Sequence, residues 1–164
     1  MRESARFAAL SLSALLALPA LGADLRPVKE PEKIAVAFPK RAKLRVVNLW
    51  ATWCAPCVAE MPDLRAIDQA FGEDVAILGV SLDDMIPDAK QASVAAFLDK
   101  QKIAFPNIYY TGNNDRLADV LNLSGELPVT IVYDAAGKEV WRHQGRIHRD
   151  KTIAQLRELL RRNR

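Results

Sequence analysis

The sequence predicts a single α/β domain in which helices cover both faces of a mixed sheet. Short apolar runs rich in β-branched residues alternate with segments whose apolar residues recur at helical spacing. Two β-rich runs around a glycine-containing turn follow, and an amphipathic segment ends the chain. With 164 residues, 50% of them apolar and 26% charged, the chain is long enough for one domain with a substantial core.

The elements are expected in the order β-α-β-α-(β/α)-β-β-α. Residues 43–51 (KLRVVNLWA) form an apolar, β-branched run that predicts a buried strand, and residues 57–72 predict a helix that stops at Gly72. Pro62 inside this helix predicts a kink. Strands separated by helices should be parallel, and the terminal hairpin should add an antiparallel pair. The remaining elements are a strand (74–84), a helix (88–102), a short aromatic strand (105–111), a helical turn or two capped by Asn113 or Asn114 (114–123), the hairpin (127–145) and a helix (149–162).

The first 22 residues have the three parts of a secretory signal peptide. Two arginines lie in MRESAR, a charge-free apolar run follows, and small residues come in ALGAD, so cleavage is expected after Gly22 or Ala23. The apolar run is shorter than the roughly 20 residues that span a bilayer, which favours a cleaved signal over an uncleaved inner-membrane anchor. The mature protein is therefore expected in a bacterial periplasm. Residues 23–42 are interpreted as an irregular lead-in with one short edge strand, and residues 43–164 as the domain.

The charge of the chain argues against nucleic acid as a partner. The formal net charge is only +3, and no concentrated basic stripe is present. The arginines of the tail RELLRRNR suit the exposed end of a C-terminal helix, where positive charge complements the helix dipole.

The only two cysteines, Cys54 and Cys57, are separated by two residues at the point where the first strand gives way to the helix. As a structural staple the pair would close a very small loop and add little stability. A zinc site needs about four ligands, but the chain offers only these cysteines and two histidines, His143 and His148, without ligand spacing. Two thiolates suit Cu(I), although no third soft ligand lies nearby. A redox pair is the favoured interpretation.

The position of the pair assigns a role to each cysteine. A helix N-terminus carries partial positive charge and free amide donors, so the Cys54 thiolate would be stabilised there as a nucleophile of low pKa. Pro56 falls inside the first turn, where its missing N–H costs nothing. Cys57, one turn further and less exposed, is expected to be the resolving thiol.

The stretch VVNLWATWCAPCVAEMP resembles the active-site segment of the thioredoxin superfamily, and more narrowly that of the periplasmic TlpA/ResA/CcmG group of thiol–disulfide oxidoreductases. The resemblance extends from about Lys43 to the end of the chain. It implies a thioredoxin fold, a redox-active Cys54–Cys57 disulfide, and a TlpA-like strand-and-helix insertion between Ser81 and Asn122. The residues that carry it are Trp53, Cys54, Ala55, Pro56 and Cys57, followed by Glu60, Met61 and Pro62.

The same resemblance implies roles for residues around the cysteines. Pro128 would be a cis-proline that leaves the backbone of Leu127 free to pair with substrate; the alternative is that Pro128 simply begins a strand. Trp53 would flank the reactive sulfur, unless it is an ordinary core aromatic. Glu60 would be a proton relay, because Asn48 stands where thioredoxin carries an aspartate; the alternative is a carboxylate that only complements the helix dipole.

The implied activity is the reduction of disulfides in exported proteins, during cytochrome c maturation or copper-site assembly. Apocytochrome c or copper-site proteins would be the substrates, and a membrane electron donor of the DsbD or CcdA kind would recharge the oxidised pair. The sequence shows no flavin, nicotinamide or metal motif, so no cofactor is expected besides the Cys54–Cys57 disulfide.

Three other functions remain open at the level of sequence. One is a dithiol oxidase of the DsbA kind, although Ala55-Pro56 lacks the histidine that strongly oxidising members carry between their cysteines. Another is a Cu(I)-binding metallochaperone. A third is a peroxidase, which usually needs a threonine and a proline around its cysteine; Thr52 is present but the proline is not.

Overall fold

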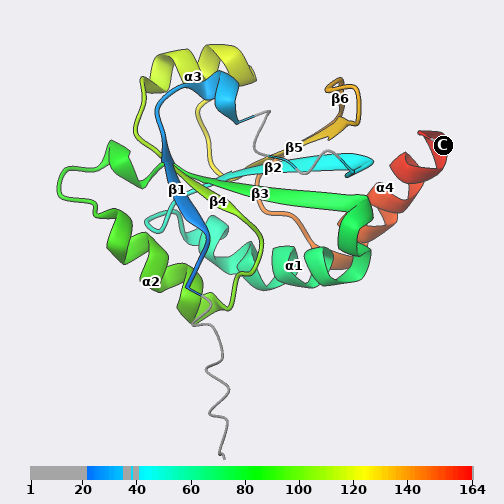
Figure 1. The fold of residues 1–164 in the computed structure, drawn as a ribbon, viewed down its shortest axis with the longest axis horizontal. Helices are drawn as coiled ribbons and strands as arrows, with labels where there is room; N and C mark the ends of the chain where they lie inside the picture. Colours follow the sequence, from blue (N-terminus) through cyan, green and yellow to red (C-terminus); the bar gives the residue numbers. More distant parts are fainter. Residues whose placement is uncertain (1–21, 35–37, 39–40, 164) are drawn as a thin grey trace, which may run out of the picture.

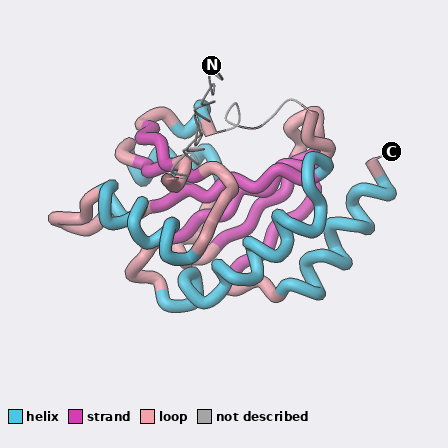
Figure 2. Tube along the Cα trace, turned by 60° about the horizontal axis from the view of Figure 1, so that its bottom comes forward, coloured by secondary structure: helices cyan, strands magenta, loops and turns pink. Residues whose placement is uncertain are grey.

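A computed structural model describes residues 22–34, 38 and 41–163, and these residues form a six-stranded mixed sheet with helices on both faces (Figures 1 and 2). The strand order is β1-β4-β3-β2-β5-β6. The strands are β1 (Leu25–Val28), β2 (Leu44–Trp50), β3 (Val75–Ser81), β4 (Asn107–Tyr110), β5 (Val129–Asp134) and β6 (Glu139–Gln144). The helices are α1 (Ala55–Phe71), α2 (Gln91–Gln101), α3 (Asn114–Leu121) and α4 (Arg149–Arg162), with short 3-10 turns η1 (Pro31–Lys33), η2 (Gly72–Asp74) and η3 (Asp83–Met85).

The predicted strands and helices are all confirmed. The strands β1 to β4 run parallel, while β5 pairs antiparallel with β2 and β6 antiparallel with β5. The lead-in contains the expected edge strand, β1. Helix α1 runs unbroken from Ala55 to Phe71 with Pro62 inside it, and it ends at Gly72, where φ is 53°. The predicted signal peptide lies outside the described residues except for Gly22. No helix in the described part of the chain is long and apolar enough to cross a bilayer.

Alternation along the central strand β2 divides the core into two layers. Val46 and Trp50 belong to the cluster that includes residues of α1, α2 and α4, whereas Val47 and Leu49 belong to the cluster that includes residues of α3. Figure 1 shows the same division, with α3 on one side of the sheet and the other three helices on the opposite side. The two layers arise because successive side chains of a strand point to opposite faces.

A row of polar residues crosses the sheet on the α1 face. Asn48 of β2 lies in register with Gly79 of β3 and Thr130 of β5, and Gly79 lies in register with Asn107 of β4. Gly79 leaves room for the Asn107 amide, because a Cβ at Gly79 would lie 1.9 Å from Asn107 Oδ1. That oxygen accepts a hydrogen bond from Trp50 Nε1 at 3.2 Å. The row therefore places hydrogen-bonding groups inside an otherwise apolar layer.

The close approach at Gly79 predicts a measurable cost of adding one methyl group. Gly79→Ala should lower the free energy of unfolding by roughly 1–3 kcal/mol, because the new Cβ displaces the Asn107 amide from its bond to Trp50. Urea unfolding of the oxidised protein measures this cost. The double variant Gly79→Ala/Asn107→Ala should be more stable than the sum of the two single losses predicts, because Asn107→Ala removes the atom that clashes. Additive losses would contradict the packing described here.

Candidate active site

The two cysteines lie where β2 passes into α1. Cys54 is the N-cap of α1, with extended backbone (φ −88°, ψ 101°), and its Sγ accepts a hydrogen bond from the Cys57 N–H at 3.3 Å. Cys54 and Cys57 form a disulfide with an S–S distance of 2.04 Å. The Cys54 sulfur therefore lies at the positive end of the helix and takes the place of a capping oxygen.

Both cysteines are buried, and Cys54 retains slightly more exposed surface than Cys57. Cys54 is 5% exposed and Cys57 is fully buried. Ala55 and Pro56, between them, are exposed in the first turn of α1. Trp53 is 48% exposed and is therefore not a core aromatic; the tryptophan that fills the core is Trp50. An approaching molecule meets Trp53 and the edge of Cys54 before it can reach Cys57.

The loop before β5 forms the next part of the site. The peptide bond between Leu127 and Pro128 is cis, as the resemblance implies. Leu127 and Trp53 both line a hollow of about 110 Å³, together with Leu82 and with Met85, which is 49% exposed. Beside Trp53, which adjoins Cys54, there is therefore a mostly apolar hollow between the end of β3, α3 and the cis-proline loop.

A buried carboxylate that the sequence analysis did not identify holds the turn before the cysteines. Asp83, two residues after the end of β3, accepts hydrogen bonds from the Thr52 N–H at 3.1 Å and from Ser81 Oγ at 2.7 Å, and the Thr52 hydroxyl also donates to it. Parallel neighbouring strands end at the same edge of a sheet, so an aspartate just beyond β3 is a sequence signal for this contact. Asp83 ties the active-site turn to the end of β3.

Glu60 lies inside the core, three residues beyond Cys57 on α1. Its Oε1 accepts a hydrogen bond from Asn48 Nδ2 at 2.8 Å, and its Oε2 accepts one from the Ile147 N–H at 2.8 Å. Asn48 Nδ2 also donates to Thr130 Oγ1 at 3.2 Å. Burial raises the pKa of Glu60 to about 7, and the bonds from Ile147 and Asn48 limit the rise because they stabilise the charged form.

This environment excludes the interpretation of Glu60 as a solvated helix charge. Its side chain has no exposed surface, and its carboxyl can gain or lose a proton near neutral pH. The sequence pointed to Glu60 but not to its partners. Asn48 was recognised only as a position that cannot titrate, and the contributions of Thr130 and the Ile147 main chain come from segments far away in sequence.

The two histidines lie apart from the cysteine pair. His143 is half-buried on β6 and stacks on Trp141 with ring centroids 5.6 Å apart, and His148 is exposed. Within residues 22–34, 38 and 41–163, no three His, Cys, Asp or Glu side chains gather closely enough to hold a metal ion.

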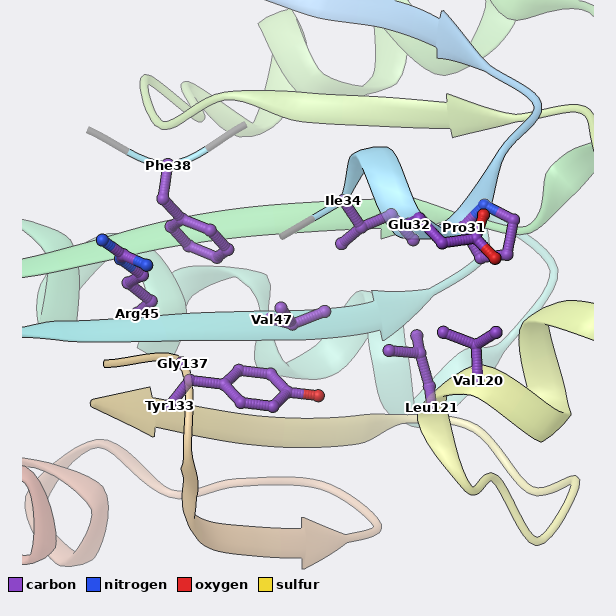
Figure 3. A pocket seen from close by; sticks show the side chains of 10 residues that line it. All are labelled: Pro31, Glu32, Ile34, Phe38, Arg45, Val47, Val120, Leu121, Tyr133 and Gly137. Carbon is purple, nitrogen blue, oxygen red and sulfur yellow. The ribbon is translucent and has the colours of Figure 1, made fainter. Parts of the chain in front are cut away.

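A second hollow, of about 200 Å³, also lies on the α3 face of the sheet, between η1, β2, β5 and α3 (Figure 3). Its walls are mostly apolar and include Val47, Leu121 and Tyr133. Figure 3 shows Arg45 at one end and Glu32 toward the other. It shares no lining residue with the hollow beside Trp53 and is therefore distinct from it.

Comparison with known proteins identifies similar chains. Residues 29–141 match the AhpC/TSA family. The thiol:disulfide interchange protein HelX of Rhodobacter capsulatus is 29% identical over 90% of this chain and 78% of its own length. The thiol-disulfide oxidoreductase ResA of Oceanobacillus iheyensis is 30% identical over 70% of this chain, but the match spans only 56% of its length. The crystal structure of a thioredoxin-related protein from Neisseria meningitidis serogroup B is 28% identical, with a TM-score of 0.57, and the match covers 69% of this chain and 82% of that one.

The raised pKa of Glu60 predicts how stability depends on pH. Between pH 4.5 and about 7 the folded state holds a proton on Glu60 that the unfolded state has released, so stability should fall as pH rises through this window. The loss attributable to Glu60 should approach roughly 3 kcal/mol. Urea unfolding of the oxidised protein and of Glu60→Gln across this window measures it. The difference between the two proteins isolates Glu60 from other carboxyls, and parallel pH profiles would contradict the prediction.

Proposed function

Since the chain belongs to the AhpC/TSA family and has the thioredoxin fold that the sequence predicts, we propose that it is a thiol–disulfide oxidoreductase that reduces disulfides in exported proteins. One observation carries the proposal. The Cys54 sulfur caps α1 directly beneath the exposed Trp53, Ala55 and Pro56, while Cys57 and the titratable Glu60 lie fully buried further along the same helix. In such a pair, the Cys54 sulfur can exchange with a target disulfide. The buried Glu60 carboxylate can accept the proton of the Cys57 thiol and so activate it.

The proposed reaction begins with the reduced pair. The Cys54 thiolate attacks one sulfur of a target disulfide, forms a mixed disulfide, and releases the other target sulfur as a thiolate. Cys57 then loses its proton to Glu60 and attacks Cys54 Sγ. This step restores the Cys54–Cys57 disulfide and releases the second target thiolate. Two electrons pass to the target for each disulfide reduced, and Glu60 later returns its proton to solvent.

The apolar hollow beside the disulfide is the proposed docking surface for the target. Trp53 and Leu127 flank it, and Leu127 precedes β5, so its backbone lies outside the paired part of that strand. An extended target segment would pair with the Leu127 backbone, held there by the cis Pro128 loop, and would bring its disulfide against Cys54. Ala55 and Pro56, exposed in the first turn, complete the contact surface.

The proposed setting is the periplasm, which follows from the signal peptide that residues 1–22 predict. The redox group is the cysteine pair itself, so electrons must come from outside the chain, from a membrane donor of the DsbD or CcdA kind. The names of the relatives, a thiol:disulfide interchange protein and a thiol-disulfide oxidoreductase, support this class of reaction. Apocytochrome c and copper-site proteins are the proposed substrates.

The direction of electron flow can be measured through the reduction potential of the pair. Trp fluorescence in glutathione or dithiothreitol buffers follows the transition, because Trp53 adjoins Cys54. A reductant should have a potential near or below that of thioredoxin, about −270 mV, whereas a value near that of DsbA, about −120 mV, would make the protein an oxidase. Stoichiometric copper that survives dialysis, without reductase turnover, would instead support the Cu(I) metallochaperone.

The division of labour between the cysteines predicts opposite results for two variants. Cys57→Ser should accumulate a stable mixed disulfide with a disulfide-bonded target, because nothing resolves it, while Cys54→Ser should form none. Non-reducing gels and intact-mass measurement detect the adduct. Adducts that form through Cys57 would reverse the assignment.

Glu60→Gln should leave mixed-disulfide formation unchanged but slow target release at pH 7 by about 100-fold, because Cys57 loses its proton acceptor. Stopped-flow measurement of the two steps separates them. Glu73→Gln makes the same chemical change at an exposed residue and serves as the matched control. Equal rates in the two variants would remove Glu60 from the mechanism.

A further inference from the structure

The connection between β6 and α4 contacts α1 at two adjacent points. Ile147 donates its main-chain N–H to Glu60 Oε2 at 2.8 Å, and Arg146 Nη2 lies 3.5 Å from Asp63 Oδ2. Glu60 and Asp63 are three residues apart on α1 and so lie on neighbouring parts of its surface. The two contacts therefore hold the same piece of chain against the same part of the helix.

The two contacts differ in depth. Glu60 is fully buried, and Ile147 is only 2% exposed. The side chains of Arg146 and Asp63 are 44% and 24% exposed. The ion pair thus lies at the surface, directly beyond the main-chain bond that holds the buried carboxylate.

The charges of the ion pair act on Glu60 in opposite directions. The Arg146 guanidinium favours the ionised carboxyl and lowers the pKa of Glu60, whereas the Asp63 carboxylate raises it. Burial has the larger effect and raises the pKa of Glu60; the effect of Arg146 opposes this rise, and the effect of Asp63 adds to it. Because these side chains are partly exposed, water and salt screen their influence.

We propose that Arg146 and Asp63 act on Glu60 from the surface, and that the opposite charges of their ion pair, held beside the bond from the Ile147 N–H to the carboxylate, tune its proton exchange in opposite directions. The inference deepens the proposed function, because it rests on Glu60 being the proton relay of the cysteine pair. Neither residue touches the sulfurs, so both act through Glu60.

The other groups around Glu60 leave this role to the ion pair. The side chain that bonds to it from β2 is that of Asn48, which in turn bonds to Thr130 of β5, and neither of these carries a charge. On α1 itself the preceding turn holds Cys57 in the disulfide. From β6, His143 lies in register with Thr130, and its Nε2 lies 3.2 Å from the main-chain oxygen of Arg146. The titratable and charged side chains around the outer side of the ion pair are His148, Arg149, Asp150 and Lys151, which line an open hollow with Asp63 and Arg146.

The test is the titration midpoint of Glu60 in the oxidised protein, followed by carbon-13 NMR of its carboxyl. Arg146→Gln should raise the midpoint, because a favourable positive charge is lost, and Asp63→Asn should lower it. Each shift should be on the order of half a pH unit at low salt and should shrink at high ionic strength. The double variant Arg146→Gln/Asp63→Asn should return toward the wild-type midpoint.

Arg149→Gln is the matched control, since it removes the same charge from the start of α4, where Arg149 pairs with Asp150. Its Glu60 midpoint should stay at the wild-type value. A merely structural anchor would shift the midpoint in the same direction in Arg146→Gln and Asp63→Asn, because either change breaks the pair. Shifts in one direction, or none, would overturn the inference.

The titration is separable from the proposed reductase function because it needs no turnover. If the wild-type protein reduces disulfides but the two variants fail to shift in opposite directions, the inference fails alone. If the opposite shifts occur but the wild-type protein has no reductase activity, the charges of Arg146 and Asp63 still tune Glu60, and the proposed function fails.

Discussion

The end of β2 is the constraint on which the active site depends. This strand is paired along both edges, with β3 on one side and β5 on the other, so the chain leaving it at Trp50 has a fixed direction. The neighbours of β2 then supply the remaining contacts: Asp83 follows β3, and the cis Pro128 loop precedes β5. Cys54 is held in place because three adjacent strand ends meet around it, rather than by the small loop that its own disulfide closes.

A carboxyl group in the core requires compensation, and the polar row across the sheet provides it. Removing Glu60 from water disfavours its charge, but Asn48 and the Ile147 N–H each donate one hydrogen bond to it. The arrangement leaves Asn48 Oδ1 buried without a partner among the described residues, and an unpaired group of this kind costs about 1–3 kcal/mol. Because the Asn48 amide does not titrate, Glu60 can gain or lose its proton independently of it. An aspartate at position 48 would instead couple the titrations of two neighbouring carboxyls.

Local signals explain how much the sequence could predict. The fold and the position of the cysteine pair are predicted by properties of neighbouring residues. These are the spacing of apolar residues, Gly72 as a helix stop and the position of Cys54 just before the helix. Glu60 was ambiguous because its burial depends on Ile147, a contact made by main chain 87 residues away. The same limit applies to Thr130 and Arg146, whose importance appears only when β5 and the β6–α4 connection are placed beside α1.

Helix α1 links the surface sulfur to a second part of the surface. Cys54, Cys57, Glu60 and Asp63 follow one another at intervals of three residues, which at 3.6 residues per turn trace a slow spiral around the helix. The spiral begins at the slightly exposed Cys54, passes through the buried Cys57 and Glu60, and reaches the partly exposed Asp63 beside Arg146. In the proposed mechanism, electrons pass through the sulfur at one end of the spiral, and the charges that tune the proton of Glu60 lie at the other. If so, changes beside Arg146 would alter proton exchange without disturbing the hollow where a target is proposed to dock.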